Sequence, residues 1–309
     1  MTRRPLTLVY FAASRLWHVS MASLRPVDDV GSDDDDAPVV YVILGSQFSA
    51  KALLALDAHG IPHRVVFVPL SRAARRLPSD ASPTVPQMTH RGAILTDSED
   101  ILHHLDDSLG ASCFPARVAR EASEASVRAS DGVLAALVLH YNWVDEPGYR
   151  RSMRAAGVRA MPWYVPLCLS GAVVDRLARK ARASFARRVR KIVAKTLFDG
   201  DDAKADATLA DPAETREALV RELEWFQATL KEAPFMLGVA EAPCAADVSA
   251  FAQLERLVGT MGDASVPPSL PELASEPRLA RLMAWRKEMS ERCPIRFKGK
   301  RGGRGGAAR

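Results

Sequence analysis

The first regular pattern along the chain is an apolar run followed by a helical repeat, in residues 39–62. Residues 39–44 are apolar and largely β-branched, and the run is short enough for a buried strand. After the turn Gly45-Ser46-Gln47-Phe48, alanine and leucine recur at helical spacing until Gly60 and Pro62 stop the helix. Such a unit puts backbone N–H groups and a hydroxyl at a helix N-terminus, which electrostatically suits an anion or a thiolate.

The next apolar runs predict a small sheet and a second helix. Residues 64–70 indicate a second strand, and residues 84–88 and 93–95 indicate two short strands around the turn at 90–92. Thr96-Asp97-Ser98-Glu99 then begins a helix with a capping box. The order β-α-β, hairpin, α is that of a thioredoxin-like α/β domain.

From residue 117 onward the pattern becomes helical. Residues 119–141 carry apolar positions at helical spacing, weakened in the middle by Gly132, and Pro147 with Gly148 end this segment. Residues 174–197 predict a basic helix with one apolar side, which favours a packed helix with a solvated basic face over an RNA- or lipid-binding patch. Residues 199–211 are expected to be a loop. Further helices are expected after Asp211-Pro212 and Cys244, so the sequence predicts an all-α second domain.

Four markers make residues 39–109 resemble the N-terminal domain of the glutathione S-transferase superfamily. The family's S-P-[YF]-x-x-K-x-x-x-x-L motif reads here as residues 46–56, with Gln47 in place of the proline. The other three are Gly60-Ile61-Pro62-His63, Val85-Pro86 and Asp97-Ser98. The resemblance implies that Pro86 is a cis-proline.

The second half resembles the helical C-terminal domain of the same superfamily. Residues 234–238 read P-F-M-L-G, and Cys244 to Asp247 match the [ST]-x-x-D that follows, with cysteine in place of the hydroxyl residue. A thiol accepts hydrogen bonds weakly, so we expect a helix cap weaker by up to ~1 kcal/mol. Residues 141–145 and the basic helix look most like the branch of failed-axon-connections and metaxin proteins.

The resemblance covers residues 39–292 and implies four parts. Residues 1–37 are expected to be a disordered leader and linker, 38–110 the thioredoxin-like domain, 117–292 the all-helical domain, and 295–309 a basic, Gly/Arg-rich disordered tail.

The resemblance also assigns the catalytic candidates. Ser46 aligns with the residue that stabilises the glutathione thiolate, and Ser49 is the second hydroxyl one turn on. The alternative is that both serines only cap the helix. Because the turn carries serines and no cysteine, disulfide exchange through a cysteine at this site is not expected.

The same resemblance implies how glutathione would be held. The backbone of Val85, turned by the cis-peptide bond to Pro86, would pair with the peptide, while Asp97 and Ser98 would receive the γ-glutamyl ammonium and carboxylate. The alternative for Asp97 and Ser98 is simple helix capping. Lys51 is expected to be a solvated helix lysine rather than an anion ligand.

Charge, cysteine content and hydropathy exclude several classes of function. The formal charge is +5, but residues 295–309 hold six cations and no acid, so the rest of the chain carries about −1 and gives no general case for nucleic-acid binding. The RGG-like tail could contact RNA only weakly. Four dispersed cysteines predict neither a metal site nor a disulfide scaffold. No run has the ~18–20 apolar residues of a membrane span, and residues 161–174 are expected to be a buried connection.

Residues 1–26 contain arginines, serines and no acid, which is the composition of an organelle transit peptide. An unstructured leader, or a start at Met21, is the alternative. We therefore expect a cytoplasmic protein, or a mitochondrial or plastid one if residues 1–26 are a targeting signal.

Together these patterns predict a glutathione S-transferase-like protein. Glutathione would be the co-substrate, no metal is expected, and a hydrophobic electrophile would be the second substrate. The resemblance leaves homodimer formation open. The competing hypothesis is a non-catalytic adaptor or binding module that keeps the same fold.

Overall fold

The computed structural model describes residues 36–68, 77–116, 118, 120–159, 167–231, 234–239, 241–261 and 266–295, with side chains of α8 from Ser170 onward. The expected leader at residues 1–26, residues 296–309 of the tail, Trp163 and the first part of the expected connection at 161–174 lie outside these ranges. The fold class expected from the sequence is confirmed.

A four-stranded sheet forms the base of the molecule, in the order β2(Arg64–Phe67), β1(Val39–Val42), β3(Gln87–His90) and β4(Ala93–Leu95). β1 pairs parallel to β2 and antiparallel to β3, and β3 pairs antiparallel to β4. Along β1 every second residue is buried, so Val40 and Val42 face the core. The expected β-α-β unit and hairpin are therefore confirmed, although β1 ends two residues earlier than predicted.

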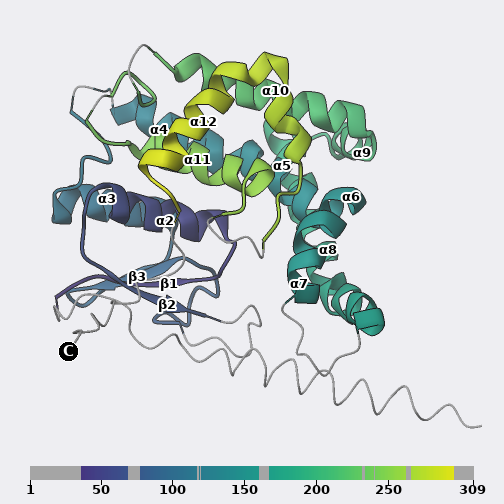
Figure 1. Cartoon of the computed structure of the whole chain (residues 1–309), viewed down its shortest axis with the longest axis horizontal. Coiled ribbons are helices and arrows are strands. Elements are labelled where there is room, and N and C mark those ends of the chain that lie inside the picture. The colour runs from purple at the N-terminus through teal and green to yellow at the C-terminus, as the bar shows by residue number, and fades with distance from the viewer. Residues whose placement is uncertain are drawn as a thin grey trace, which may run out of the picture.

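Two helices lie on the sheet, α2(Gln47–Ala58) and α3(Ser98–Leu109) (Figure 1). α3 has one apolar side, formed by Ile101, Leu102 and Leu105. In α2, by contrast, residues 49–56 are buried on every side. A helix buried all round must be covered twice, and α2 lies between the sheet and a helix of the second domain.

The rest of the described chain is helical. Its elements are α4(Arg120–Ala129), η2(Ser130–Leu134), α5(Ala135–Leu139), η3(His140–Val144), α6(Glu146–Tyr149), η4(Arg150–Arg154), α7(Ala155–Arg159), α8(Leu167–Leu197), α9(Asp202–Ala210), α10(Pro212–Thr229), α11(Ala245–Val258), η5(Pro271–Ser275), η6(Pro277–Leu279) and α12(Ala280–Arg292). η2, η3 and η4 are π-helical. Gly132 in η2 leaves the helical conformation, as its place in the sequence suggested.

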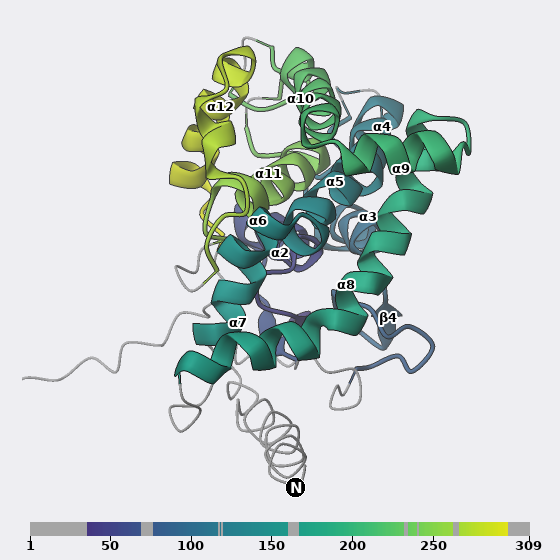
Figure 2. The ribbon, with the colours of Figure 1, turned by 90° about the vertical axis from the view of Figure 1, so that its right-hand side faces the viewer.

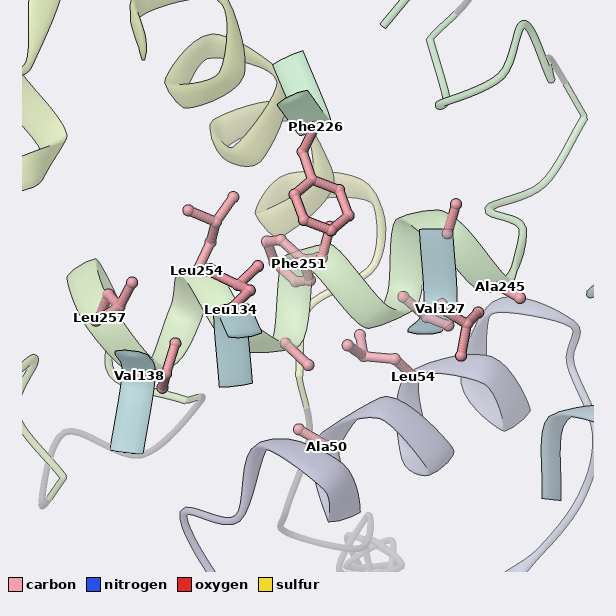
Figure 3. Close-up of a cluster of buried hydrophobic side chains, with 14 of the residues drawn as sticks. Ala50, Leu54, Val127, Leu134, Val138, Phe226, Ala245, Phe251, Leu254 and Leu257 are labelled. Atoms are coloured by element: carbon pink, nitrogen blue, oxygen red, sulfur yellow. The ribbon is translucent and has the colours of Figure 1, made fainter. Parts of the chain in front are cut away.

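The core of the helical region is organised around α11, whose residues 245–257 are all buried. Figure 3 shows α11 between α2, which contributes Ala50 and Leu54, and Phe226 of α10. Val127, Leu134 and Val138, from the chain α4–η2–α5, complete the cluster (Figure 3). One hydrophobic core therefore runs from the sheet through α2 into the helical domain.

The basic helix is confirmed as α8, and it extends seven residues further toward the N-terminus than predicted. It runs diagonally from α7 to α9 on one side of the molecule (Figure 2). The loop expected at residues 199–211 is wrong, because most of it forms α9. Asp201 caps this helix by accepting hydrogen bonds from the backbone N–H groups of Ala203 and Lys204, and alanine favours the helical state.

One smaller expectation is refined. The helix ends in the expected segment, but the break lies at Asp145, which has a ψ of 122°. Pro147 and Gly148 follow in the first turn of α6, where proline lacks a hydrogen bond that the helix would not make in any case. Among the tryptophans, Trp225 is 43% exposed, whereas Trp285 is buried. No helix in the described ranges is long and apolar enough to cross a membrane.

Candidate functional site

The strand register brings the three predicted site segments to one edge of the sheet. β3 pairs Tyr41 with Gln87 and Met88 with Leu95. The end of β1, the start of β3 and the end of β4 therefore lie side by side. Each predicted segment adjoins one of these strand ends. The turn with Ser46 follows β1, the Val85-Pro86 bond precedes β3, and the Asp97 cap follows β4. Segments about 50 residues apart in sequence thus converge on the N-termini of α2 and α3.

The turn after β1 is tightly built. Gly45 has a φ of +77°, a conformation that L-residues rarely adopt, and a Cβ there would lie 3.4 Å from Val266 Cγ1. Ser46 is the N-cap of α2, and its Oγ accepts a hydrogen bond from the backbone N–H of Ser49 at 3.3 Å. The half-buried Ser46 hydroxyl donates to no group among the described residues. Its proton is therefore available to a ligand.

Ser49 occupies a different environment from Ser46. Its side chain is fully buried, and its Oγ accepts a hydrogen bond from the backbone N–H of Ile43 at 3.4 Å. This bond ties the first turn of α2 to the end of β1. The catalytic role suggested for Ser49 stays a prediction, and the structure gives its hydroxyl a clear role in holding the turn.

The Val85-Pro86 peptide bond is cis, as the sequence resemblance implied. Pro86 is buried, and Val85 is partly exposed at the sheet edge. The neighbouring Gln87 fixes the preceding loop, because its side chain donates to the carbonyl of Ser82 at 2.7 Å and accepts from the N–H of Ser79 at 3.0 Å. The backbone of Val85 is thus held in place for pairing with a peptide.

At the third segment, Asp97 is the N-cap of α3 and Ser98 its first residue. Asp97 is exposed, and its Oδ1 accepts a hydrogen bond from the backbone N–H of Glu99 at 2.8 Å. The capping role considered for Asp97 is therefore present. Ser98 is 2% exposed and lies at the positive end of the helix. Binding of glutathione by Asp97 and Ser98 stays a prediction.

Lys51 was expected to be solvated, and this is wrong. Its side chain is 1% exposed, and its Nζ lies 2.6 Å from Oδ2 of Asp131 in η2 of the helical domain. The reason is the double coverage of α2, which leaves this position facing another helix rather than water. Sequence reasoning did not single out Asp131, although it is the only acidic residue in 125–144.

The electrostatics connect this ion pair to the α3 cap. Burial raises the pKa of Asp131, the ammonium of Lys51 opposes that shift, and the negative charge of Asp97 raises the pKa further. Oδ1 of Asp131 is buried and has no hydrogen-bond partner among the described groups. The charge of Asp97 is thus felt at Asp131, and the ammonium of Lys51 is the counter-ion that the structure places on the Asp131 carboxylate.

No group of three or more histidine, cysteine or acidic side chains in the described part of the chain could hold a metal ion. The residues at the sheet edge provide hydroxyls, backbone amides, helix N-termini and carboxylates. This arrangement can bind a zwitterionic peptide and stabilise a thiolate.

Residues 40–112 match the family described as the glutathione S-transferase N-terminal domain. This segment contains all six predicted site residues. No curated protein matches the chain.

Solved structures similar to the chain include three glutathione transferases. One is human glutathione transferase theta-2 in a complex with glutathione and an unknown ligand. It is 16% identical in sequence, the match covers 83% of this chain and 82% of the human chain, and the TM-score is 0.49. A delta-class enzyme of Nilaparvata lugens has 14% identity, coverages of 83% and 90%, and a TM-score of 0.43. Unclassified glutathione S-transferase 2 of Bombyx mori has 16% identity, coverages of 83% and 89%, and a TM-score of 0.45.

Proposed function

We propose that this chain, whose residues 40–112 match the glutathione S-transferase N-terminal domain, binds glutathione at the sheet edge and conjugates it, through its thiol sulfur, to a hydrophobic electrophile. The observation that carries the proposal is the convergence of Ser46, the Val85-Pro86 bond and the Asp97-Ser98 helix start on one edge.

In this proposal the thiol of glutathione lies at the N-terminus of α2. Ser46 Oγ accepts from Ser49 N–H, so its own proton points to another acceptor, and a thiolate is that acceptor. The hydroxyl and the positive helix end favour the thiolate over the thiol, which lowers the thiol pKa and raises the population of the nucleophile. The thiolate then attacks the electrophilic carbon, and the leaving group departs with the bonding electron pair.

The other end of glutathione lies at the start of α3. The backbone of Val85, which precedes the cis peptide bond, would pair with the peptide. Ser98 and the N-terminus of α3 receive the γ-glutamyl carboxylate, while Asp97 and Asp131 receive its ammonium. The ammonium suits this position because it relieves the repulsion between the two carboxylates.

The second candidate function is a non-catalytic binding module of the metaxin and failed-axon-connections type. The observation that favours it is that both hydroxyl and carboxylate candidates already have structural partners, since Ser46 caps α2 and Asp97 caps α3. In this alternative the fold is a scaffold, and its outer surfaces rather than the sheet edge would bind partners.

Calorimetric titration with glutathione separates the two proposals. We expect a saturable heat at millimolar or lower glutathione for the unmodified chain. Ser98→Ala should weaken binding by at least about tenfold, because hydrogen bonds to charged groups contribute about 1.5–3 kcal/mol. Ser108→Ala is the matched control, since Ser108 lies exposed in the same helix, and it should bind as the unmodified chain does. No heat at millimolar glutathione would contradict glutathione binding and favour the scaffold.

A further inference from the structure

A hollow of ≈480 Å³ lies between the C-terminal half of α8 and the start of α9. Its charged lining consists of Arg187, Arg190, Lys191, Lys195 and Asp202. A volume of this size is in the range of small-molecule sites, ~300–1,000 Å³. α9 lies on the far side of α2 and α3 from the sheet (Figure 1), so this hollow is separate from the candidate glutathione site.

The charges in this hollow are unbalanced. Arg190 is neutralised, because its guanidinium pairs with Asp202 at 2.7 Å and with Asp206 at 3.3 Å. The other three cations, Arg187, Lys191 and Lys195, are exposed and form no ion pair with any described residue. They follow one another at four-residue spacing on one face of α8, which separates successive positions by about 6 Å along the axis. Four cations against the carboxylates of Asp202 and Asp206 leave a net charge of +2 (4 − 2) at the hollow.

The ends of the two helices meet at this hollow. The carbonyl of Ala194, near the negative end of α8, already accepts hydrogen bonds from Phe198 and Gly200, and Gly200 lines the hollow. Asp201 follows Gly200 and caps α9 by accepting from the N–H groups of Ala203 and Lys204. The positive field of the hollow therefore comes from the side chains of Arg187, Lys191 and Lys195.

We propose that this hollow binds a compact polyphosphate, meaning two or three adjacent phosphate groups. A phosphate monoester carries about −1.5 to −2 charges at pH 7, so a short phosphate chain can pair with all three of the unpaired cations Arg187, Lys191 and Lys195. Arginine and lysine both bind phosphate, arginine through a fork of N–H donors and lysine as a point charge. The phosphates can belong to a soluble nucleotide or to a polyphosphorylated lipid headgroup, which present the same chemistry.

A short polyanion fits better than a nucleic-acid strand. The exposed carboxylates of Asp199, Asp202 and Asp206 lie at the α9 side of the hollow. A strand that continued past α9 would meet these acids, and their repulsion would oppose its binding. A ligand confined to the hollow meets only Asp202, whose carboxylate is paired with Arg190.

The test is a calorimetric titration with inorganic tripolyphosphate in low-salt, metal-free buffer. We expect saturable binding that Lys191→Gln and Lys195→Gln each weaken by roughly fivefold, the effect of removing one unit charge about 4 Å from another in water. Arg179→Gln is the matched control: Arg179 is an exposed cation of the same helix that does not line the hollow, and its loss should change affinity by less than about twofold.

Three results would overturn the proposal. The first is no binding at millimolar tripolyphosphate, and the second is an equal loss of affinity in Arg179→Gln, which would indicate unspecific attraction. The third is binding of a single-stranded RNA that tripolyphosphate does not displace. Thermal melting is the control for misfolding. Without ligand the variants should have the Tm of the unmodified chain, and with tripolyphosphate they should lack the rise in Tm that the unmodified chain shows.

Two further arms identify the source of the phosphates. ATP binding with the same dependence on Lys191 and Lys195 would assign the hollow to a soluble nucleotide. Binding to vesicles that contain a polyphosphoinositide, with that same dependence and with ATP inactive, would assign it to a lipid headgroup.

Discussion

The ammonium of Lys51 lies 2.6 Å from the carboxylate of Asp131, and this contact joins the first helix on the sheet to the π-helical bend of the helical domain. Lys51 is 1% exposed and Asp131 is partly exposed. A buried lysine without its counter-ion would carry a large desolvation cost. The pair is therefore a polar contact between α2 and the helical domain, in addition to the packing of α2 against α11.

This pair predicts the outcome of a double-mutant cycle. Lys51→Met should lower the free energy of unfolding by about 3 kcal/mol, because it leaves the Asp131 carboxylate largely buried without a partner. Adding Asp131→Leu should restore much of the loss. Arg150→Met is the control, since Arg150 forms an exposed pair with Glu146 and its loss should cost less than about 1 kcal/mol. Urea unfolding measures the unmodified chain, the two single variants Lys51→Met and Asp131→Leu, the double variant and the control, and additive effects of the two single variants would contradict the coupling.

Substitution of Ser46 and substitution of Ser49 should have different effects on the conjugation rate and on the free energy of unfolding. Ser46→Ala removes a donor to the thiolate and should lower the rate of conjugation to an aromatic electrophile by about a hundredfold or more. Ser49→Ala should change that rate less but lower the free energy of unfolding by about 1–3 kcal/mol, because the N–H of Ile43 loses its acceptor. Equal rates in all three proteins would remove both serines from the chemistry. A rate loss confined to Ser49→Ala would assign the contact with the thiolate to Ser49 instead of Ser46.

Stability should depend on pH through Asp247. Burial raises its pKa to about 6, against the opposing hydrogen bonds from the backbone of Met236 and Cys244. Between about pH 4 and pH 6 the folded chain therefore holds a proton that the unfolded chain has lost. The free energy of unfolding should fall as pH rises through this window, by on the order of 3 kcal/mol.

The control for this titration is Asp247→Asn, which removes the ionisable group. Urea unfolding of both proteins across the window isolates the contribution of Asp247, because every other group is shared. The downward slope should be steeper in the unmodified chain. Parallel curves would show that the pKa of Asp247 does not differ between the folded and unfolded states.

The cap of α11 gives a stabilising substitution. Cys244 is the N-cap, and its thiol donates to Asp247 Oδ2 at 3.1 Å, while its backbone N–H donates to the same oxygen at 2.9 Å. Cys244→Ser supplies a stronger acceptor for the N–H groups of the first turn and should raise the free energy of unfolding by up to about 1 kcal/mol. A thermal melt compares it with Cys113→Ser, a buried cysteine outside any helix cap, which should not be stabilised.

Much of the fold could be predicted from the sequence because the local signals agree with the tertiary structure. Three features could be predicted from neighbouring residues alone. They are the strand at the β-branched run 39–44, the end of α2 at Gly60 and the apolar side of α3. α9 was missed because its aspartates suggested a solvated loop, whereas Asp201 is its cap. The π-helical turns were not predicted, because their register depends on how η2, η3 and η4 pack against α8 and α11.

The candidate site was predictable in its residues but not in its connection to the second domain. Ser46, Pro86 and Asp97 each follow a local motif, and strand order places them together. The burial of Lys51 depends on Asp131, which is 80 residues away in the chain. A periodic pattern within one helix cannot reveal which distant element will cover it.

The double coverage of α2 has a consequence during synthesis on the ribosome. α2 ends at Ala58, and the helix that covers its outer face begins at Ala245, 187 residues later (245 − 58). At about 5–20 residues per second, the interval between the two is about 10–40 s. During that time Ala50 and Leu54 of the nascent chain have no partner from α11. A ribosome-bound intermediate that ends before residue 245 is therefore the form of this protein on which a chaperone would act.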